Sequence, residues 1–223
     1  MAPPHRQDVI AVLVQRFGGP EELTVEDVSV PATRSGEALV RVYAAGVGPW
    51  DALVRSGNSG LPQTLPLTPG SDIAGIVERI DGDGSHVRIG DAVYGVTNSS
   101  FTGGYAEYAA ASLTSLARKP ERLSFIEAAS VPVIAVTAWQ MLFDRASVSQ
   151  GQTVLVLGAA GNVGSYAVQI AEWAGARVVP ISDSRRGFEK ASGVDVVIDT
   201  VGGETQERSF ETLKRGGMLV SSV

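Results

Sequence analysis

The spacing of hydrophobic and polar residues changes near Ser124. Before that residue, short stretches alternate apolar and polar side chains, as half-buried strands do. We predict strands at Ala38–Ala44, Asp72–Ile80, Val87–Val96 (two short strands with Gly90-Asp91 between them) and Tyr105–Ala111. Because Gly, Pro and Asp separate these stretches, the sequence predicts a compact barrel-like β domain over residues 1–123.

After Ser124 the pattern favours an α/β domain over residues 124–223. Ser124 and Glu127 match a capping box, and the apolar run that follows predicts a helix that Pro132 kinks or divides. A polar connection is expected at residues 144–152. Strands are predicted at Thr153–Leu157, Ala176–Ile181, Val194–Ile198 and Met218–Val223, with a helix after the first of them. The first strand is apolar enough to be buried on both faces of a parallel sheet.

Three glycines lie between that buried strand and the helix after it, namely Gly158, Gly161 and Gly164. In a dinucleotide-binding turn, one glycine permits the sharp turn, another lets a pyrophosphate approach the backbone, and the third lets helix and sheet pack closely. The free amides and the positive end of the helix dipole favour the anion. We predict such a site, with a ligand-free glycine-rich turn as the alternative.

The residues after the second strand of this domain bear on the choice between NAD and NADP. An acidic residue there binds the ribose 2′-hydroxyl of NAD, whereas basic or small polar residues admit the 2′-phosphate of NADP. The chain reads Ser182-Asp-Ser-Arg-Arg186. Asp183 favours NAD, whereas Ser182, Ser184, Arg185 and Arg186 favour NADP. A solvated polar turn is the third interpretation, so this segment leaves the choice open.

Composition excludes several classes of protein. A net charge of -6 argues against a general nucleic-acid binder. The absence of cysteine excludes disulfides, thiolate zinc sites and a cysteine nucleophile. A Ser-His-Asp triad is disfavoured because the two histidines, His5 and His86, lie in a proline-rich leader and a turn. No apolar run is long enough to span a membrane. We expect a soluble cytoplasmic protein without a metal, a nucleic-acid partner or a membrane partner.

Seven segments in order along the chain resemble the zinc-independent medium-chain dehydrogenase/reductases, especially NADPH:quinone oxidoreductases of the zeta-crystallin type. They are Ala44–Gly57, Leu67–Val77, Gly90–Val96, Gly103–Ala109, Ala128–Trp139, Gly158–Ala171 and Asp195–Glu204. The resemblance implies a GroES-like β-barrel domain over residues 1–123 and a Rossmann domain with a doubly wound parallel sheet over 124–223, with the active site in the cleft between them. Zinc-dependent relatives have Cys and His-Glu ligands where this chain has the Gly46–Asp51 region and Ser71-Asp72.

The activity implied by the resemblance is hydride transfer from NADP(H), with NAD possible, to a quinone or an α,β-unsaturated carbonyl. Such acceptors need no zinc, because the negative charge delocalises onto oxygen. Two alternatives stay open. One is a shortened chain that binds nucleotide weakly or not at all and does no catalysis, and the other is a 2-enoyl thioester reductase. A homodimer is expected.

The resemblance also implies site residues. The substrate-pocket residues are Gly48, Trp50, Asp51 and Asn98. The cofactor-binding residues are Asp51, Thr137, Gly158, Ala160, Gly161, Asn162, Val163, Gly164, Ser182, Asp183, Arg185, Thr200 and Val201. Many relatives carry Asn where Gly48 stands. No residue is identified as the proton donor: Tyr43 and Tyr105 are candidates, with core packing as the alternative, and water can protonate the product.

Two stretches depart from the resembled family. Relatives have a further helix, strand and loop between Ser182 and Val194, where this chain has only Asp183–Gly193. We expect an internal deletion there that abbreviates the adenosine side of the cofactor site, or a loop missing from the sequence. Relatives also continue beyond the position of Val223. We therefore expect a Rossmann domain that is incomplete at its C-terminus, whose last strand has an exposed apolar edge.

Overall fold

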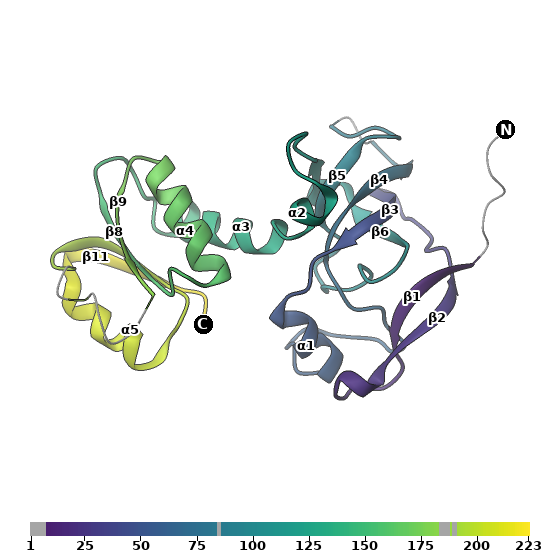
Figure 1. Ribbon diagram of the computed structural model, residues 1–223, viewed down its shortest axis with the longest axis horizontal. Helices are drawn as coiled ribbons and strands as arrows, with labels where there is room; N and C mark the ends of the chain where they lie inside the picture. Colours follow the sequence, from purple (N-terminus) through teal and green to yellow (C-terminus); the bar gives the residue numbers. More distant parts are fainter. Residues whose placement is uncertain (1–7, 84–85, 183–187, 189–190) are drawn as a thin grey trace. The chain divides into compact units, whose positions relative to one another are not determined.

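The computed structural model describes residues 8–83, 86–182, 188 and 191–223, and it divides into two compact units (Figure 1). The units are residues 1–133 and 134–223, so the division follows Val133 instead of residue 123. The physical reason is helix α2 (Phe125–Ala129), which packs on the first unit. Its Ala128 and Ala129 are buried in a cluster with Ala74 of that unit.

The predicted capping box and the predicted break at Pro132 are both confirmed. The amide of Glu127 donates to the Ser124 hydroxyl at 3.2 Å, and the Glu127 carboxylate accepts from the Ser124 amide at 2.8 Å. Helix α2 ends at Ala129, and helix α3 (Pro132–Trp139) begins at the proline. Because proline lacks an N–H and has a fixed φ, it suits the first position of a new helix better than an interior one.

An antiparallel sheet in the order β6-β3-β4-β5-β7 forms the body of the first unit. Its strands are β3 (Glu37–Ala45), β4 (Asp72–Asp81), β5 (Ala92–Val96), β6 (Tyr108–Ser112) and β7 (Leu116–Arg118). Alternate apolar residues point into one core cluster, which includes the fully buried Val40, Ile73 and Val93. This architecture agrees with the predicted β domain.

Two of the predicted strands differ in extent. From Val87 to Asp91 the chain is a loop, and only β5 is a strand, because Gly90 takes a φ of +90° and its amide turns back to the Val77 carbonyl. The strand expected from Tyr105 begins at Tyr108. Residues 105–107 instead bond the N-terminal hairpin, for example through the Val12 amide and the Tyr105 carbonyl at 2.8 Å.

Several elements of the first unit were not predicted from the pattern. They are the hairpin of β1 (Asp8–Val14) and β2 (Leu23–Ser29), helix α1 (Pro49–Ser56), and the 3-10 turns η1 (Pro20–Glu22) and η2 (Leu113–Ser115). Helix α1 starts with a proline and stops at Gly57, whose φ of +76° ends the helix in a left-handed turn.

A parallel sheet in the order β11-β10-β8-β9 forms the second unit. Its strands are β8 (Thr153–Leu157), β9 (Arg177–Ile181), β10 (Val194–Asp199) and β11 (Leu213–Ser221). Strand β8 is buried on both faces as predicted: Val154 and Val156 join one core cluster, and Leu155 and Leu157 join the other. Strand β11 begins at Leu213, five residues before the predicted start at Met218.

The helices of the second unit are α4 (Asn162–Trp173) and α5 (Gly203–Ser209), followed by the 3-10 turn η5 (Phe210–Thr212). Figure 1 shows α4 and α5 on opposite sides of the parallel sheet, so the unit has a Rossmann-type layering. Helix α3 continues into a π-helix, η3 (Gln140–Arg145), which the sequence did not predict. In the described ranges, no helix has the length and apolar character to cross a bilayer.

Candidate functional site

The glycine turn between β8 and α4 has the geometry that its sequence predicts. Gly158 takes a φ of +76°, which only glycine adopts without strain. A Cβ on Gly164 would stand within 3.0 Å of the Gly158 carbonyl oxygen, so only glycine lets the helix pack this close to the turn. A Cβ on Gly161 would stay 3.2 Å from the same oxygen, which is tight but much less severe. The first and third glycines therefore shape the turn.

The exposed part of the turn carries free backbone donors. Ala160, Gly161 and Asn162 are exposed, and Gly161 is the N-cap of α4 without a side chain to cap it. The first amides of a helix, here those of Asn162, Val163 and Gly164, have no intrahelical acceptor. This arrangement of uncapped amides and positive helix end fits a pyrophosphate. The residues present therefore fit the dinucleotide that the turn predicts.

Two further predicted cofactor residues, Thr200 and Val201, lie against the same turn. A Cβ on Gly158 would collide with Thr200 Oγ1 and approach Val201, which shows that both residues lie against the turn. The Thr200 hydroxyl donates to the Leu157 carbonyl at 2.8 Å and ties β10 to β8. Ser182 is exposed directly after β9. Asp183 and Arg185 lie outside the described residues.

Asp199 is a buried residue at the end of β10 that sequence reasoning missed. Its Oδ1 accepts from the amides of Val201 and Gly202, both at 3.0 Å. Its Oδ2 accepts from Gln206 Nε2 at 2.8 Å and from the Ser221 hydroxyl at 2.9 Å. Asp199 thus fixes the strand ends at which open α/β sheets bind ligands. The sequence signal that could have identified Asp199 is an acidic residue at the end of an apolar strand.

Thr137 lines an open hollow of about 540 Å³ in the second unit. The end of β11 with Ser221, and Ser222 after it, also line this hollow, and the π-helix contributes Gln140, Met141 and Arg145. The structure therefore brings Thr137 to a concave surface with two hydroxyl groups that the sequence did not suggest. Ser221 connects this hollow to Asp199 and so to the glycine turn.

In the first unit, Asp51 is buried, and one of its oxygens is fully engaged. Asp51 Oδ2 accepts from the Gly48 amide at 2.8 Å and from the Tyr105 hydroxyl at 2.7 Å, while Oδ1 is buried and has no hydrogen-bond partner among the residues that the structure describes. Burial raises the pKa of the Asp51 carboxyl, and the donors Gly48 and Tyr105, together with the nearby backbone of Gly70, oppose that rise. Burial and the neighbouring carboxylate likewise raise the pKa of Tyr105. Of the two tyrosines considered as donors, Tyr105 is committed to Asp51 and Tyr43 is half exposed.

Trp50 connects to a second buried carboxylate. Its Nε1 donates to the Ser71 hydroxyl at 3.1 Å, and that hydroxyl donates to Asp72 Oδ2 at 3.0 Å. Asp72 Oδ1 accepts from the Val133 amide at 2.7 Å, at the start of α3. Burial raises the pKa of Asp72; its hydrogen bonds lower it, and Asp51 adds to the rise. Ser71 and Asp72 therefore hold the start of a helix and an indole.

Asn98, predicted as a pocket wall, holds a turn. Its Oδ1 accepts from the Ser100 amide at 2.9 Å, and its Nδ2 donates to the Thr102 carbonyl at 2.8 Å. Of the predicted pocket residues, Gly48, Trp50 and Asp51 thus share the first turn of α1, and Asn98 shapes the loop that carries Phe101. In the ranges that the structure describes, no three His, Cys, Asp or Glu side chains gather in a way that would hold a metal.

Comparison with known families matches both halves of the chain. Residues 34–121 match the family described as "Alcohol dehydrogenase GroES-like domain". Residues 126–216 match the family described as "Glutamate/Leucine/Phenylalanine/Valine dehydrogenase". These two matches fall on the antiparallel β unit and on the unit with the glycine turn, respectively, apart from the few residues around α2.

Individual relatives agree over most of the chain. A quinone oxidoreductase of Pongo abelii is 34% identical over 237 residues, covering 94% of this chain and 71% of the relative. A 2-methylene-furan-3-one reductase of Solanum lycopersicum is 35% identical over 194 residues, covering 82% of this chain and 50% of the relative. The structure of the quinone oxidoreductase from Coxiella burnetii superposes with a TM-score of 0.85 at 34% identity, covering 96% of this chain and 75% of that one.

The matched segments include the GroES-like sheet and the glycine turn that the sequence predicts. Together with the Rossmann-type layering of the second unit, they establish an oxidoreductase with a nicotinamide dinucleotide cofactor. The chain belongs to the quinone oxidoreductase branch of the medium-chain dehydrogenase/reductase family.

Proposed function

We propose that this chain reduces quinones or α,β-unsaturated carbonyl compounds with NADPH and without zinc. The observation that carries the proposal is the exposed glycine turn with the uncapped start of α4, in a chain similar to quinone oxidoreductases. Gly158, Gly161 and Gly164 with the first amides of α4 would hold the pyrophosphate. Ser182 would lie near the adenosine ribose, and Thr137 with Ser221 would lie near the nicotinamide.

The chemistry suits the residues that the chain offers. When bound, the reduced nicotinamide supplies a hydride, and a quinone or enone accepts it because the negative charge delocalises onto oxygen. Zinc independence is supported by the absence of cysteine and by the bonds of Ser71 and Asp72. Both oxygens of Asp72 are occupied by protein donors, Val133 and Ser71. With Tyr105 committed to Asp51, we propose that water supplies the proton.

The NADP preference is supported by Ser182 and by Arg185, which lies outside the described residues, and opposed by Asp183. The direct test follows oxidation of NADPH and of NADH with 9,10-phenanthrenequinone as the acceptor. We expect turnover with both and a larger kcat/KM for NADPH. Metal-free protein prepared with a chelator should keep its rate. Turnover that requires added zinc would contradict the proposal.

The cofactor site has its own test in a matched pair of N-cap glycines. Gly161 and Gly19 have nearly the same backbone φ, -78° and -77°, and Gly19 precedes the turn η1 far from the predicted site in sequence. We expect Gly161→Ala to weaken NADPH binding about tenfold, because a methyl group would stand between the pyrophosphate and the amides. Gly19→Ala should leave binding unchanged in the same fluorescence titration. If Gly161→Ala and Gly19→Ala bind NADPH equally well, the glycine turn is not the pyrophosphate site.

A second candidate activity is reduction of a 2-enoyl thioester instead of a quinone or an enone. The similarity to the 2-methylene-furan-3-one reductase favours an enone over a 2-enoyl thioester. A substrate panel of quinones, enones and 2-enoyl thioesters distinguishes them. NADPH binding without turnover on any of these acceptors would instead support the other alternative, a shortened chain without catalysis.

The homodimer and the cytoplasmic location expected from the sequence stay predictions. Light scattering during gel filtration measures the oligomeric state, and cell fractionation measures the location.

A further inference from the structure

The hollow beside Thr137 contains a charged side chain that the proposed reduction does not use. Among the described residues that line this hollow, Arg145 alone carries a charge. Arg145 is exposed at the end of the π-helix η3, and it forms no ion pair with any acid in the part of the chain that the structure describes. A guanidinium that lines a hollow without a paired carboxylate is suited to bind an anion from solution.

The π-helix brings a second donor to the same face. In an α-helix, at 100° per residue, side chains five residues apart point about 140° away from each other. In η3 the Ala146 amide instead donates to the Met141 carbonyl, five residues earlier, at 3.1 Å. This wider turn places residues five apart above each other, and Gln140 and Arg145 accordingly both line the hollow. A π-helix is rare in proteins, and its single turns occur frequently at functional sites.

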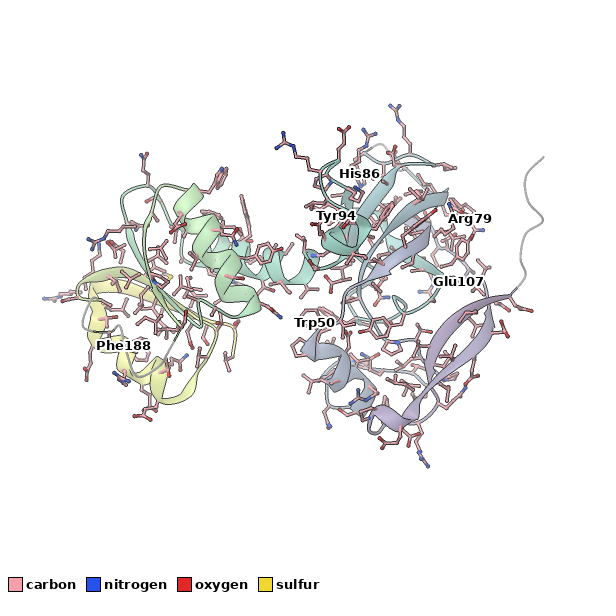
Figure 2. The ribbon with its side chains drawn as sticks, in the orientation of Figure 1. Trp50, Arg79, His86, Tyr94, Glu107 and Phe188 are labelled. Carbon is pink, nitrogen blue, oxygen red and sulfur yellow. The ribbon has the colours of Figure 1, made fainter. Side chains whose placement is uncertain are left out.

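Apolar side chains form the rest of the lining next to these donors. Met141 contributes from η3, and Met218, Leu219 and Val220 contribute from β11. Leu219 and Val220 pack against opposite core clusters, and Figure 2 labels Phe188, which packs against the same cluster as Leu219. Met218 stays 46% exposed, and a methionine side chain adapts to ligands of different shape. A ligand that fits this lining has an apolar body and one anionic group.

The walls of the hollow set the length of that ligand. Thr137, which the proposed function assigns to the nicotinamide, and Arg145 lie on one continuous helix. At about 1.5 Å per residue, their backbones are roughly 12 Å apart along the helix axis. The chain also lines the hollow from Met218 to Ser222, and at about 3.3 Å per residue this stretch is roughly 13 Å long. An anion at Arg145 and a ring at Thr137 are therefore separated by a similar length.

We propose that Arg145 and Gln140 bind a carboxylate on the hydride acceptor, so that the proposed reductase prefers quinones or enones with an apolar chain ending in a carboxylate about 10–12 Å from the reacting ring. One guanidinium matches the single charge of a carboxylate better than the nearly double charge of a phosphate monoester. This inference rests on the proposed function, because that function assigns the Thr137 end of the hollow to the nicotinamide. It names an acceptor class within that function.

The test compares kcat/KM with NADPH for 8-(1,4-naphthoquinon-2-yl)octanoic acid and for its methyl ester, which differ by one charge. The wild type should prefer the acid about tenfold, as expected for one charge-assisted hydrogen-bonded pair in an open site. Arg145→Gln should bring the acid-to-ester ratio to about one. Arg177→Gln is the matched control and should keep the tenfold ratio. It alters an exposed arginine of β9, which lies at the opposite edge of the same sheet from β11.

Exchanging two neighbouring residues conserves both composition and net charge. In Asp144→Arg/Arg145→Asp, the guanidinium moves to an exposed position and a carboxylate replaces it in the hollow. The ester should then have the larger kcat/KM, because like charges repel. Arginine in the last turn of a helix also stabilises the helix dipole, but that role does not change an acid-to-ester ratio measured on one protein. A ratio near one in the wild type, or a tenfold ratio that survives in Arg145→Gln, would overturn the proposal.

A binding measurement separates this inference from the proposed function. The probe is 8-(naphthalen-2-yl)octanoic acid, which accepts no hydride, titrated into the protein by calorimetry. Its Kd should rise about tenfold in Arg145→Gln and stay the same in Arg177→Gln. If the wild type reduces no acceptor but shows this Arg145-dependent binding, the proposed function fails and the carboxylate site stands. If the wild type reduces both quinones but binds the probe no better than Arg145→Gln does, the function stands and the site is overturned.

Discussion

The two units build their candidate sites from different parts of the chain. In the second unit, backbone forms the site: the glycine turn and the first amides of α4 lie within residues 158–164. In the first unit, side chains form it, and they come from distant positions. Asp51 bonds Tyr105, 54 residues later, and Trp50 bonds Ser71, 21 residues later.

This difference separates two kinds of sensitivity to mutation. A backbone site tolerates no Cβ where the chain approaches itself, so it restricts residue type to glycine and leaves a local pattern. A side-chain site depends on partners, so each residue is replaceable only if its partner's hydrogen bond is also satisfied. Four substitutions test this contrast, in order of expected effect.

Asp199→Ala should have the largest effect, because Asp199 makes the backbone site depend on a side chain. The change leaves the amides of Val201 and Gly202 and the side chains of Gln206 and Ser221 without their acceptor. We expect a loss of about 3–5 kcal/mol in the free energy of unfolding, measured with urea. Asp195→Ala, on the same strand, removes an ion pair with Lys214 and one bond from the Thr153 amide, and should cost about 1–2 kcal/mol. Similar losses for both aspartates would contradict the central role of Asp199.

Gly164→Ala should be the next most severe change. Its Cβ meets the Gly158 carbonyl, which is backbone and cannot rotate away, so α4 must shift. Overpacking of this kind costs about 3 kcal/mol. Gly161→Ala should cost under about 1 kcal/mol, because its Cβ lies 3.2 Å from that oxygen. Thermal and urea unfolding of the Gly164→Ala and Gly161→Ala variants measure these two losses of stability. Equal stability of the two variants would show that close packing of α4 is not what requires glycine.

Tyr105→Phe tests the side-chain site. The variant removes one of the two donors to Asp51 Oδ2 and leaves the Gly48 amide as the other. We expect a loss of about 1.5 kcal/mol in unfolding free energy, as for a hydrogen bond to a charged group. Tyr43→Phe, on a ring that is 50% exposed, should change stability by less than about 0.5 kcal/mol. If Tyr105→Phe leaves the free energy of unfolding unchanged, the Asp51 carboxylate must accept a hydrogen bond from another donor.

The smallest effect concerns pH. Burial raises the pKa of Asp51 above its ordinary value of 3.8, so the folded state holds the proton more tightly than the unfolded state. The protonated Asp51 carboxyl therefore stabilises the folded state fully below pH 3.8. This stabilisation is lost as pH rises through the raised pKa of the folded state. The Tm of the wild type should therefore fall relative to that of Asp51→Asn as pH rises from 3.8 toward neutrality. Asp27→Asn, on the exposed strand β2, is the control. A Tm difference that does not change with pH would contradict the raised pKa.

Local signals predicted much of the fold. The capping box at Ser124, the division at Pro132, the buried strand β8 and the glycine turn were all read from neighbouring residues. The hairpin of β1 and β2 was missed although Gly18-Gly19-Pro20 between the strands is a turn signal, because the pairing of the two strands is a long-range feature that the local pattern does not show. The π-helix η3 was missed because it continues α3 through residues without a distinct pattern.

By itself the sequence determined the two fold classes, the glycine turn and the family, because each leaves residue types at fixed short spacings. The tertiary structure alone decided that Asp199 organises the strand ends and that Asn98 holds the turn that carries Phe101. It alone decided that Trp50 fills the space left by Gly48. These facts depend on hydrogen bonds and ring contacts between residues that only folding brings together, and on the local strain at Phe101 that those contacts maintain.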